Sequence, residues 1–196
     1  ATLARLAKPL RKAVVYAHRL TRILELVLKI LRLRFVRKKH LSRANDVPSL
    51  IVSVTSFPPR IRGVWAAIEA VFEQTLQPDR LILTLASEQF PGKKLPRRLR
   101  QQVRRGLEIW WLDENGGSFD KLLPLLEHFP DSCVVTIDDD KLIPPDLLQK
   151  LHLAHERHPG AIVGTRGWEM RLVDGKLSYG RGWTRAAAES TSAELF

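Results

Sequence analysis

The sequence has a single cysteine, a single methionine, few aromatic residues and no long uninterrupted hydrophobic run. Because Cys133 is the only cysteine, no intramolecular disulfide can form, and nothing marks an oxidising compartment. The N-terminal charges are interspersed with apolar residues, which is not the pattern of a secretory signal. We therefore expect a cytoplasmic location.

Acidic residues are nearly absent from the first part of the chain. Residues 1–45 hold 13 Lys and Arg against the single acid Glu25, which leaves 19 basic and 20 acidic residues for the remainder. The formal net charge of +11 therefore belongs to this N-terminal arm, and the rest of the chain is close to neutral. A neutral globular part argues against nucleic acid as a partner.

Within the arm, the apolar residues recur at helical spacing and predict an amphipathic helix over residues 20–35. Glu25, Lys29 and Arg32 interrupt the run too often for a transmembrane helix. A basic amphipathic helix suits an anionic membrane surface, so we expect residues 1–45 to hold the protein peripherally at the inner membrane face. Packing of the apolar face on another part of the protein, or on a second subunit, stays open.

The remainder, residues 48–185, alternates apolar β-branched runs with helical patterns, followed by an incomplete segment over residues 186–196. This alternation predicts an α/β domain with a mostly parallel sheet and flanking helices, which binds its ligands at the carboxyl ends of the strands. Asp174 and Gly175 predict the turn of a later hairpin. The expected strands are residues 50–55, 81–85, 107–112, 133–137 and 161–164, and the expected helices are residues 60–76, 95–105, 119–128 and one beginning at Pro144.

Three adjacent aspartates, Asp138, Asp139 and Asp140, follow the strand predicted at residues 133–137. Neighbouring carboxylates repel one another, so a structure that keeps them needs a cation or hydrogen-bond donors. Mg²⁺ or Mn²⁺ would suit, because these ions take one or two carboxylates and leave the other positions to substrate phosphates and water. Asp138 and Asp140 are the expected metal ligands. A solvated acidic turn is the alternative.

Four sequence blocks together carry a resemblance to a known family. They are residues 51–61 (IVSVTSFPPRI), 73–80 (EQTLQPDR), 118–124 (SFDKLLP) and 136–140 (TIDDD), the last followed by Pro144 and Pro145. In order and spacing they resemble bacterial glycosyltransferases of the GT-A fold, similar to glycosyltransferase family 2, over about residues 49–168. The resemblance implies a Rossmann-like domain that binds a nucleoside-diphosphate-sugar donor, with a UDP-sugar as the first candidate.

The same resemblance implies roles for individual residues. Thr55 and Arg60 would border the nucleotide, Asp113 and Lys121 would line the base and ribose pocket, and residues 138–140 would hold donor and metal. The acceptor would be a cell-surface glycan or a lipid-linked molecule. The general base is expected beyond Phe196, so the acceptor half would be incomplete or missing. The alternatives are another Mg²⁺-dependent nucleotidyl or phosphoryl transfer enzyme, and a non-catalytic, membrane-associated nucleotide-binding module.

Overall fold

The structure is a computed structural model that describes residues 20–21, 23–33, 39–41, 49–169, 172–173, 176–177 and 184–185. The chain divides into two compact units, Ala1–Pro145 and Asp146–Phe196. The predicted terminal segment, residues 186–196, and most of the predicted arm lie outside the described residues.

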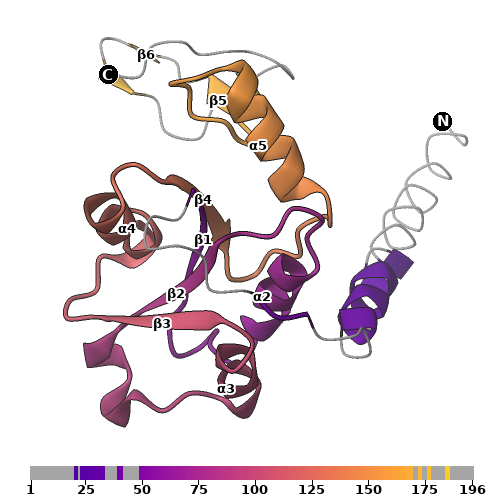
Figure 1. Cartoon of the computed structure of the whole chain (residues 1–196), viewed down its shortest axis with the longest axis vertical. Coiled ribbons are helices and arrows are strands. Elements are labelled where there is room, and N and C mark those ends of the chain that lie inside the picture. The colour runs from indigo at the N-terminus through magenta and orange to yellow at the C-terminus, as the bar shows by residue number, and fades with distance from the viewer. Residues whose placement is uncertain are drawn as a thin grey trace, which may run out of the picture. The chain divides into compact units, whose positions relative to one another are not determined.

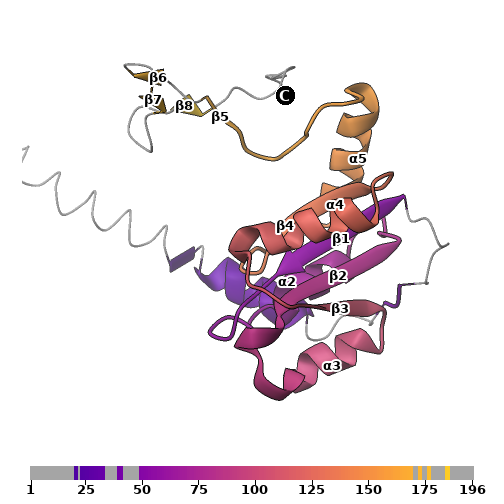
Figure 2. The same cartoon turned by 90° about the vertical axis from the view of Figure 1, so that its left-hand side faces the viewer.

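The first unit is built on a sheet of four parallel strands in the order β3-β2-β1-β4 (Figures 1 and 2). This confirms four of the expected strands and the predicted α/β class with a parallel sheet and flanking helices, which is consistent with a Rossmann-like fold. Long apolar runs form β1 and β2 because both faces of these strands are covered. The strands are β1 (Leu50–Thr55), β2 (Arg80–Ala86), β3 (Leu107–Leu112) and β4 (Cys133–Asp138).

Helices cover both faces of this sheet. On one face, Ile51 and Ile82 pack with Leu125 and Phe129, so α4 (Leu123–His128) lies on that side. On the other side lie α2 (Trp65–Phe72) and α3 (Arg97–Val103) (Figure 1). Three short 3₁₀ helices complete the connections: η1 (Ser87–Gln89), η2 (Pro91–Lys93) and η3 (Gly117–Lys121).

Two predicted helices are shorter than the sequence pattern indicated. The helix expected at residues 60–76 begins only at Trp65, because tight turns precede it: Arg60 N donates to Phe57 O at 2.9 Å and Gly63 N to Arg60 O at 2.7 Å. The helix expected at residues 119–128 is η3 followed by α4, with Leu122 between them at φ −123°, ψ −62°. Both differences lie in the connections that approach the carboxyl ends of the strands.

In the second unit, α5 (Leu147–Arg157) carries an i,i+4 ion pair from Lys150 to Asp146. β5 (Trp168–Glu169) pairs antiparallel with β8 (Thr184–Arg185), and β6 (Leu172–Val173) with β7 (Lys176–Leu177). The second pairing confirms the predicted hairpin across residues 174–175. The strand predicted at residues 161–164 is wrong: these residues form no strand, and Ile162 is 89% exposed. A short apolar run does not make a strand where no neighbouring strand accepts its hydrogen bonds.

Among the described residues of the arm, 20–21 and 23–33 are helical, whereas 39–41 are not. Most of their large apolar side chains are exposed, namely Leu20, Ile23, Leu24, Leu26, Val27, Leu28 and Leu31. Among the described helices, none has the length and apolar character needed to cross a membrane.

Asp79 joins the start of β2 to the start of β1. One carboxylate oxygen, Oδ2, accepts hydrogen bonds from Ser49 N at 2.8 Å, Ser49 Oγ at 2.8 Å and Leu50 N at 2.9 Å. Burial alone would raise the pKa of Asp79, but these three donors outweigh it and hold the pKa below its ordinary value of 3.8. A lowered folded-state pKa stabilises the protein above the unfolded-state pKa, and that contribution is lost as the pH falls further.

We therefore expect Asp79→Ala to lower the free energy of unfolding by about 1 to 3 kcal/mol at pH 7, because three donors lose their acceptor. The difference from the unsubstituted protein should shrink when urea unfolding is repeated well below the ordinary pKa of 3.8, because protonation then removes the charge from Asp79. A difference that is the same at both pH values would show that the ionised carboxylate contributes nothing.

Candidate functional site

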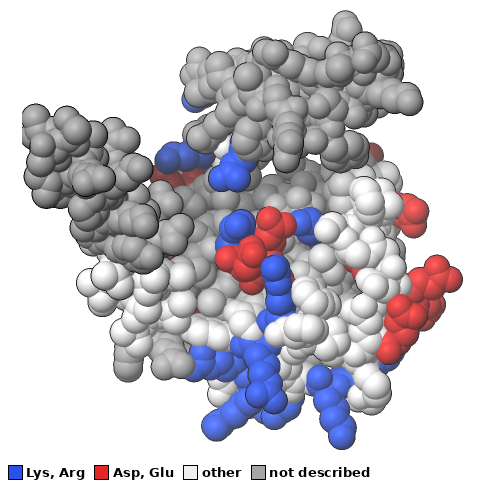
Figure 3. All heavy atoms as spheres, turned by 180° about the vertical axis from the view of Figure 1, so that it is seen from behind, with Lys and Arg blue, Asp and Glu red and all other residues white. Residues whose placement is uncertain are grey.

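The carboxyl ends of β1, β2 and β4 meet at one edge of the sheet and surround a pocket of about 380 Å³. The strand register places Thr55 directly beside Asp138 on one side and Thr84 on the other. Figure 3 shows a patch of acidic side chains near the middle of the view with basic side chains at its border, and further acidic side chains at one side. The pocket is lined by Thr55, Ser56, Phe57, Arg60, Ala86, Gln89, Asn115, Gly117, Ser118, Asp120, Lys121, Asp138, Asp139, Asp140 and Lys141.

Asp138 ends β4 and forms an ion pair with Lys121, whose Nζ lies 2.6 Å from Asp138 Oδ1. Lys121 comes from η3, which follows β3 and returns to the same edge. The hydrogen bond from Lys121 is the main reason why the pKa of Asp138 lies below its ordinary value of 3.8. Asp138 is therefore ionised throughout the neutral range. The carboxylate is 55% exposed and remains open to solvent.

Asp139 and Asp140 differ in where their carboxylates point. Asp139 is 7% exposed and turns toward the protein, where it accepts hydrogen bonds from Ser56 Oγ at 2.7 Å and Arg60 Nη1 at 2.9 Å. Asp140 is 46% exposed and lies 3.3 Å from the same Arg60 nitrogen and 3.6 Å from Lys141 Nζ. Asp139 therefore positions the β1–α2 loop, while Asp138 and Asp140 remain accessible to a ligand.

The loop that delivers Lys121 is fixed by its neighbour Asp120. This buried carboxylate accepts a hydrogen bond from Gly116 N at 2.9 Å. Burial raises the pKa of Asp120, and the hydrogen bond from Gly116 opposes that rise. A Cβ at position 116 would lie only 2.5 Å from Asp120 Oδ1, so the close approach requires glycine there. The loop therefore holds a defined course over the pocket.

The segment after the aspartates is fixed from the opposite side by the end of α2. The fully buried Gln74 donates from Nε2 to Pro144 O at 2.7 Å, and Thr75 N donates to Pro145 O at 2.8 Å. Residues 139–145 are thus held at both ends, by the strand before them and by α2 after them. This restraint limits how far the aspartates can move when a ligand binds.

The donor chemistry of this pocket fits a hard divalent cation. Among the described residues, no three His, Cys, Asp or Glu side chains converge on one metal position. Asp138 and Asp140 nevertheless offer half-exposed carboxylate oxygens on one rim. Mg²⁺ and Mn²⁺ commonly take one or two protein carboxylates and complete their shell with phosphate oxygens and water. The residues therefore suit a metal that arrives with a phosphorylated ligand more than an all-protein cage.

No protein-family model and no curated protein matches this chain. The family resemblance therefore rests on the four sequence blocks. The parallel α/β fold rests on the structure itself.

The structure brings six of the seven predicted site residues to the pocket. Thr55, Arg60, Lys121 and all three aspartates line it. Asp113 does not; it is exposed at the end of β3, and Asn115 of the same loop lines the pocket instead. Sequence reasoning also missed Ser56 and Lys141. Each is adjacent in the chain to a predicted residue, but the spacing of the sequence does not show which of the neighbouring residues lines the pocket.

Proposed function

We propose that this chain binds a nucleoside-diphosphate-sugar together with Mn²⁺ or Mg²⁺ and acts as the donor-binding half of a GT-A glycosyltransferase. The observation that carries the proposal is the pocket at the carboxyl ends of the parallel strands, where two accessible carboxylates stand among fixed cations. Ligands of open parallel α/β sheets bind at this edge. Three of the four sequence blocks that resemble the glycosyltransferases supply most of the pocket's lining, and the block at residues 73–80 supplies none of it.

Arg60 and Lys121 now neutralise the aspartates and would do the same for a diphosphate. Arg60 is half exposed and contacts two carboxylates, so its guanidinium can exchange one of them for phosphate oxygens with little movement. Asp138 and Asp140 would hold the metal, which would stabilise the negative charge that develops on the leaving diphosphate. Thr55 ends β1 beside Asp138 and would border the nucleotide. We assign no general base and no acceptor pocket to the described residues.

The proposal predicts that a nucleoside diphosphate stabilises the protein only when a divalent cation is present. Ligand at about 100 times its dissociation constant should raise the free energy of unfolding by about 2.7 kcal/mol. For a chain of this length the melting temperature should rise by roughly 5 to 10 °C. UDP, GDP and their sugars are titrated with and without Mn²⁺ by thermal shift and calorimetry.

Stabilisation by Mn²⁺ and one nucleotide together, but by neither alone, is the expected result. Stabilisation by a nucleotide without metal would support nucleotide binding in the pocket but contradict the proposed metal dependence. Unchanged melting with every nucleotide, in a sample shown to be folded by circular dichroism, would refute donor binding. A non-catalytic membrane module would then be favoured, since the arm exposes an apolar helix.

A further inference from the structure

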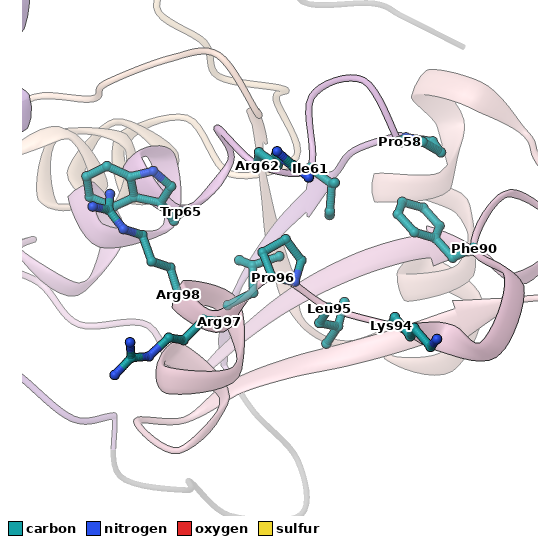
Figure 4. Close-up of a pocket in the computed structure, with 11 residues that line it drawn as sticks. Pro58, Ile61, Arg62, Trp65, Phe90, Lys94, Leu95, Pro96, Arg97 and Arg98 are labelled. Carbon is teal, nitrogen blue, oxygen red and sulfur yellow. The ribbon is translucent and has the colours of Figure 1, made fainter.

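A second hollow, of about 570 Å³, lies between the β1–α2 connection and the segment that leads into α3 (Figure 4). Its lining shares no residue with the pocket at the strand ends. We call it the basic groove. It is lined by Pro58, Ile61, Arg62, Trp65, Phe90, Lys94, Leu95, Pro96, Arg97, Arg98 and Leu99.

The floor of the basic groove is apolar and its rim is cationic. Ile61, Phe90 and Leu99 are buried side chains of the core that reach the floor. At one end the guanidinium of Arg98 stacks over the ring of Trp65 at 4.0 Å. Figure 4 shows Arg97 beside Arg98, with its side chain pointing away from Trp65, and Lys94 at the other end. A bare anion would need only the rim, so this combination fits a ligand with an anionic group and an adjoining apolar part.

The charge around the groove is one-sided. Residues 89–107 contain seven Lys and Arg and no acid, although the chain beyond the arm is nearly neutral. One of the seven, Arg105, is used in a buried ion pair. Within the described part of the chain, no ion pair joins Lys94, Arg97 or Arg98 to a carboxylate. These cations are therefore available for an anionic partner.

We propose that the basic groove binds an anionic membrane phospholipid, with the phosphate at the end that carries Arg97 and Arg98, the adjoining glycerol and acyl chain on the apolar floor, and Lys94 near the head groups of neighbouring lipids. A membrane is favoured over an acidic protein because the same chain exposes the apolar residues of its N-terminal helix. Leu41, later in the chain than this helix, also donates from N to Arg105 O at 2.9 Å, just after α3.

The β1–α2 connection couples the basic groove to the pocket at the strand ends. Pro58, Ile61 and Arg62 line the groove, whereas Phe57 and Arg60 of the same turns line the pocket. A lipid in the groove would hold these turns against the membrane surface. The lipid site does not depend on donor binding, so its test can fail or succeed independently of the nucleotide titration.

The test measures binding of the full chain to vesicles of phosphatidylglycerol and phosphatidylcholine in equal parts, compared with phosphatidylcholine alone. The groove variant is Lys94→Gln/Arg97→Gln/Arg98→Gln. The matched control, Lys150→Gln/Arg157→Gln/Arg166→Gln, removes the same charge outside the groove. Each Lys or Arg near an anionic surface strengthens binding about fivefold. The groove variant should therefore bind on the order of 100-fold more weakly, while the control changes little.

An equal loss of vesicle affinity in both triple variants would mean that the lipid surface attracts the overall positive charge of the protein. That result would overturn the basic groove as a lipid site. Because Arg98 also stacks on Trp65, the double variant Lys94→Gln/Arg97→Gln is measured as well; both of its side chains are exposed, and it should still lose on the order of 25-fold. Retention of full binding by this variant would contradict the proposal.

A second measurement separates a lipid from a simple anion. Dihexanoyl-phosphatidylglycerol below its micellar concentration should shift the indole N–H resonance of Trp65 in a saturable way, and inorganic phosphate should not. Equal shifts of the Trp65 resonance with inorganic phosphate would show that the groove binds simple anions, and the proposed phospholipid ligand would then be wrong. Binding of an oligoglutamate peptide without binding of vesicles would assign the groove to an acidic protein partner instead.

Discussion

Arg105→Met should lower the free energy of unfolding by about 3 to 5 kcal/mol, because it leaves a buried carboxylate without its partner. Arg105 Nη1 lies 2.7 Å from Glu69 Oε2, and both side chains are about 5% exposed. The guanidinium also donates from Nε to Lys39 O at 2.8 Å and stacks on Phe72 at 4.1 Å. Urea unfolding at pH 7 measures the loss, and Arg104→Met, at the exposed neighbouring position, should change little.

The double variant Glu69→Leu/Arg105→Met should recover much of that loss. A buried ion pair costs desolvation on both sides, so replacing both partners with apolar groups is often close to neutral, whereas removing one is not. Gln102 would also lose its hydrogen bond to Glu69, which limits the recovery. If Arg105→Met behaved like Arg104→Met, the pair would not be buried as the structure shows.

Asp138→Asn and Asp140→Asn should each weaken Mn²⁺-dependent nucleotide binding about 100-fold, which corresponds to roughly 2.7 kcal/mol. Each replaces a charged oxygen ligand with a neutral amide, and a metal that takes only two protein carboxylates depends on both. Calorimetric titration of the nucleotide in the presence of Mn²⁺ measures the effect. Both carboxylates are about half exposed, so the fold itself should lose little stability.

The matched control for these variants is Asp131→Asn. Asp131 is exposed and precedes β4, so it lies at the opposite end of the strand from the pocket. The Asp131→Asn substitution removes the same charge as the other two and should leave the affinity for the nucleotide unchanged. Equal weakening in all three variants would show that the aspartates act only through the overall charge of the protein, and the proposed metal ligands would then be wrong.

The sequence predicts the four parallel strands because each is an apolar run of six or seven residues that is followed by polar residues. β1 and β2 are almost wholly buried, whereas β3 and β4 are partly exposed. The order β3-β2-β1-β4 does not follow from such patterns, since it depends on which strands pair across distant parts of the chain. The failure at residues 161–164 has the same cause. Local composition shows that an apolar run can form a strand, but it does not show that a neighbouring strand is present to pair with it.

The structure brings predicted site residues to the pocket where they follow strands directly, and the prediction was incomplete where the course of a loop decides. Thr55 and Asp138 meet because parallel strands end at the same edge. Lys121 reaches Asp138 only through the course of residues 113–120, which depends on the close contact between Gly116 and Asp120. The inward turn of Asp139 toward Ser56 is likewise a tertiary effect. Side-chain direction after the last strand residue is not fixed by the period of two.

The most direct test of the account is to find where Mn²⁺ sits when UDP is bound. Paramagnetic broadening of backbone amide signals in the full chain reports residues close to the ion. A metal at the strand ends should broaden the signals of Thr55, Lys121 and Asp138–Asp140 most strongly, and the amide signals of residues 94, 95 and 97–99 less. The broadening should depend on UDP and be lost in the Asp138→Asn/Asp140→Asn variant. Broadening that centres on other acidic residues, or that persists in that variant, would contradict a metal-dependent nucleotide site at this edge of the sheet.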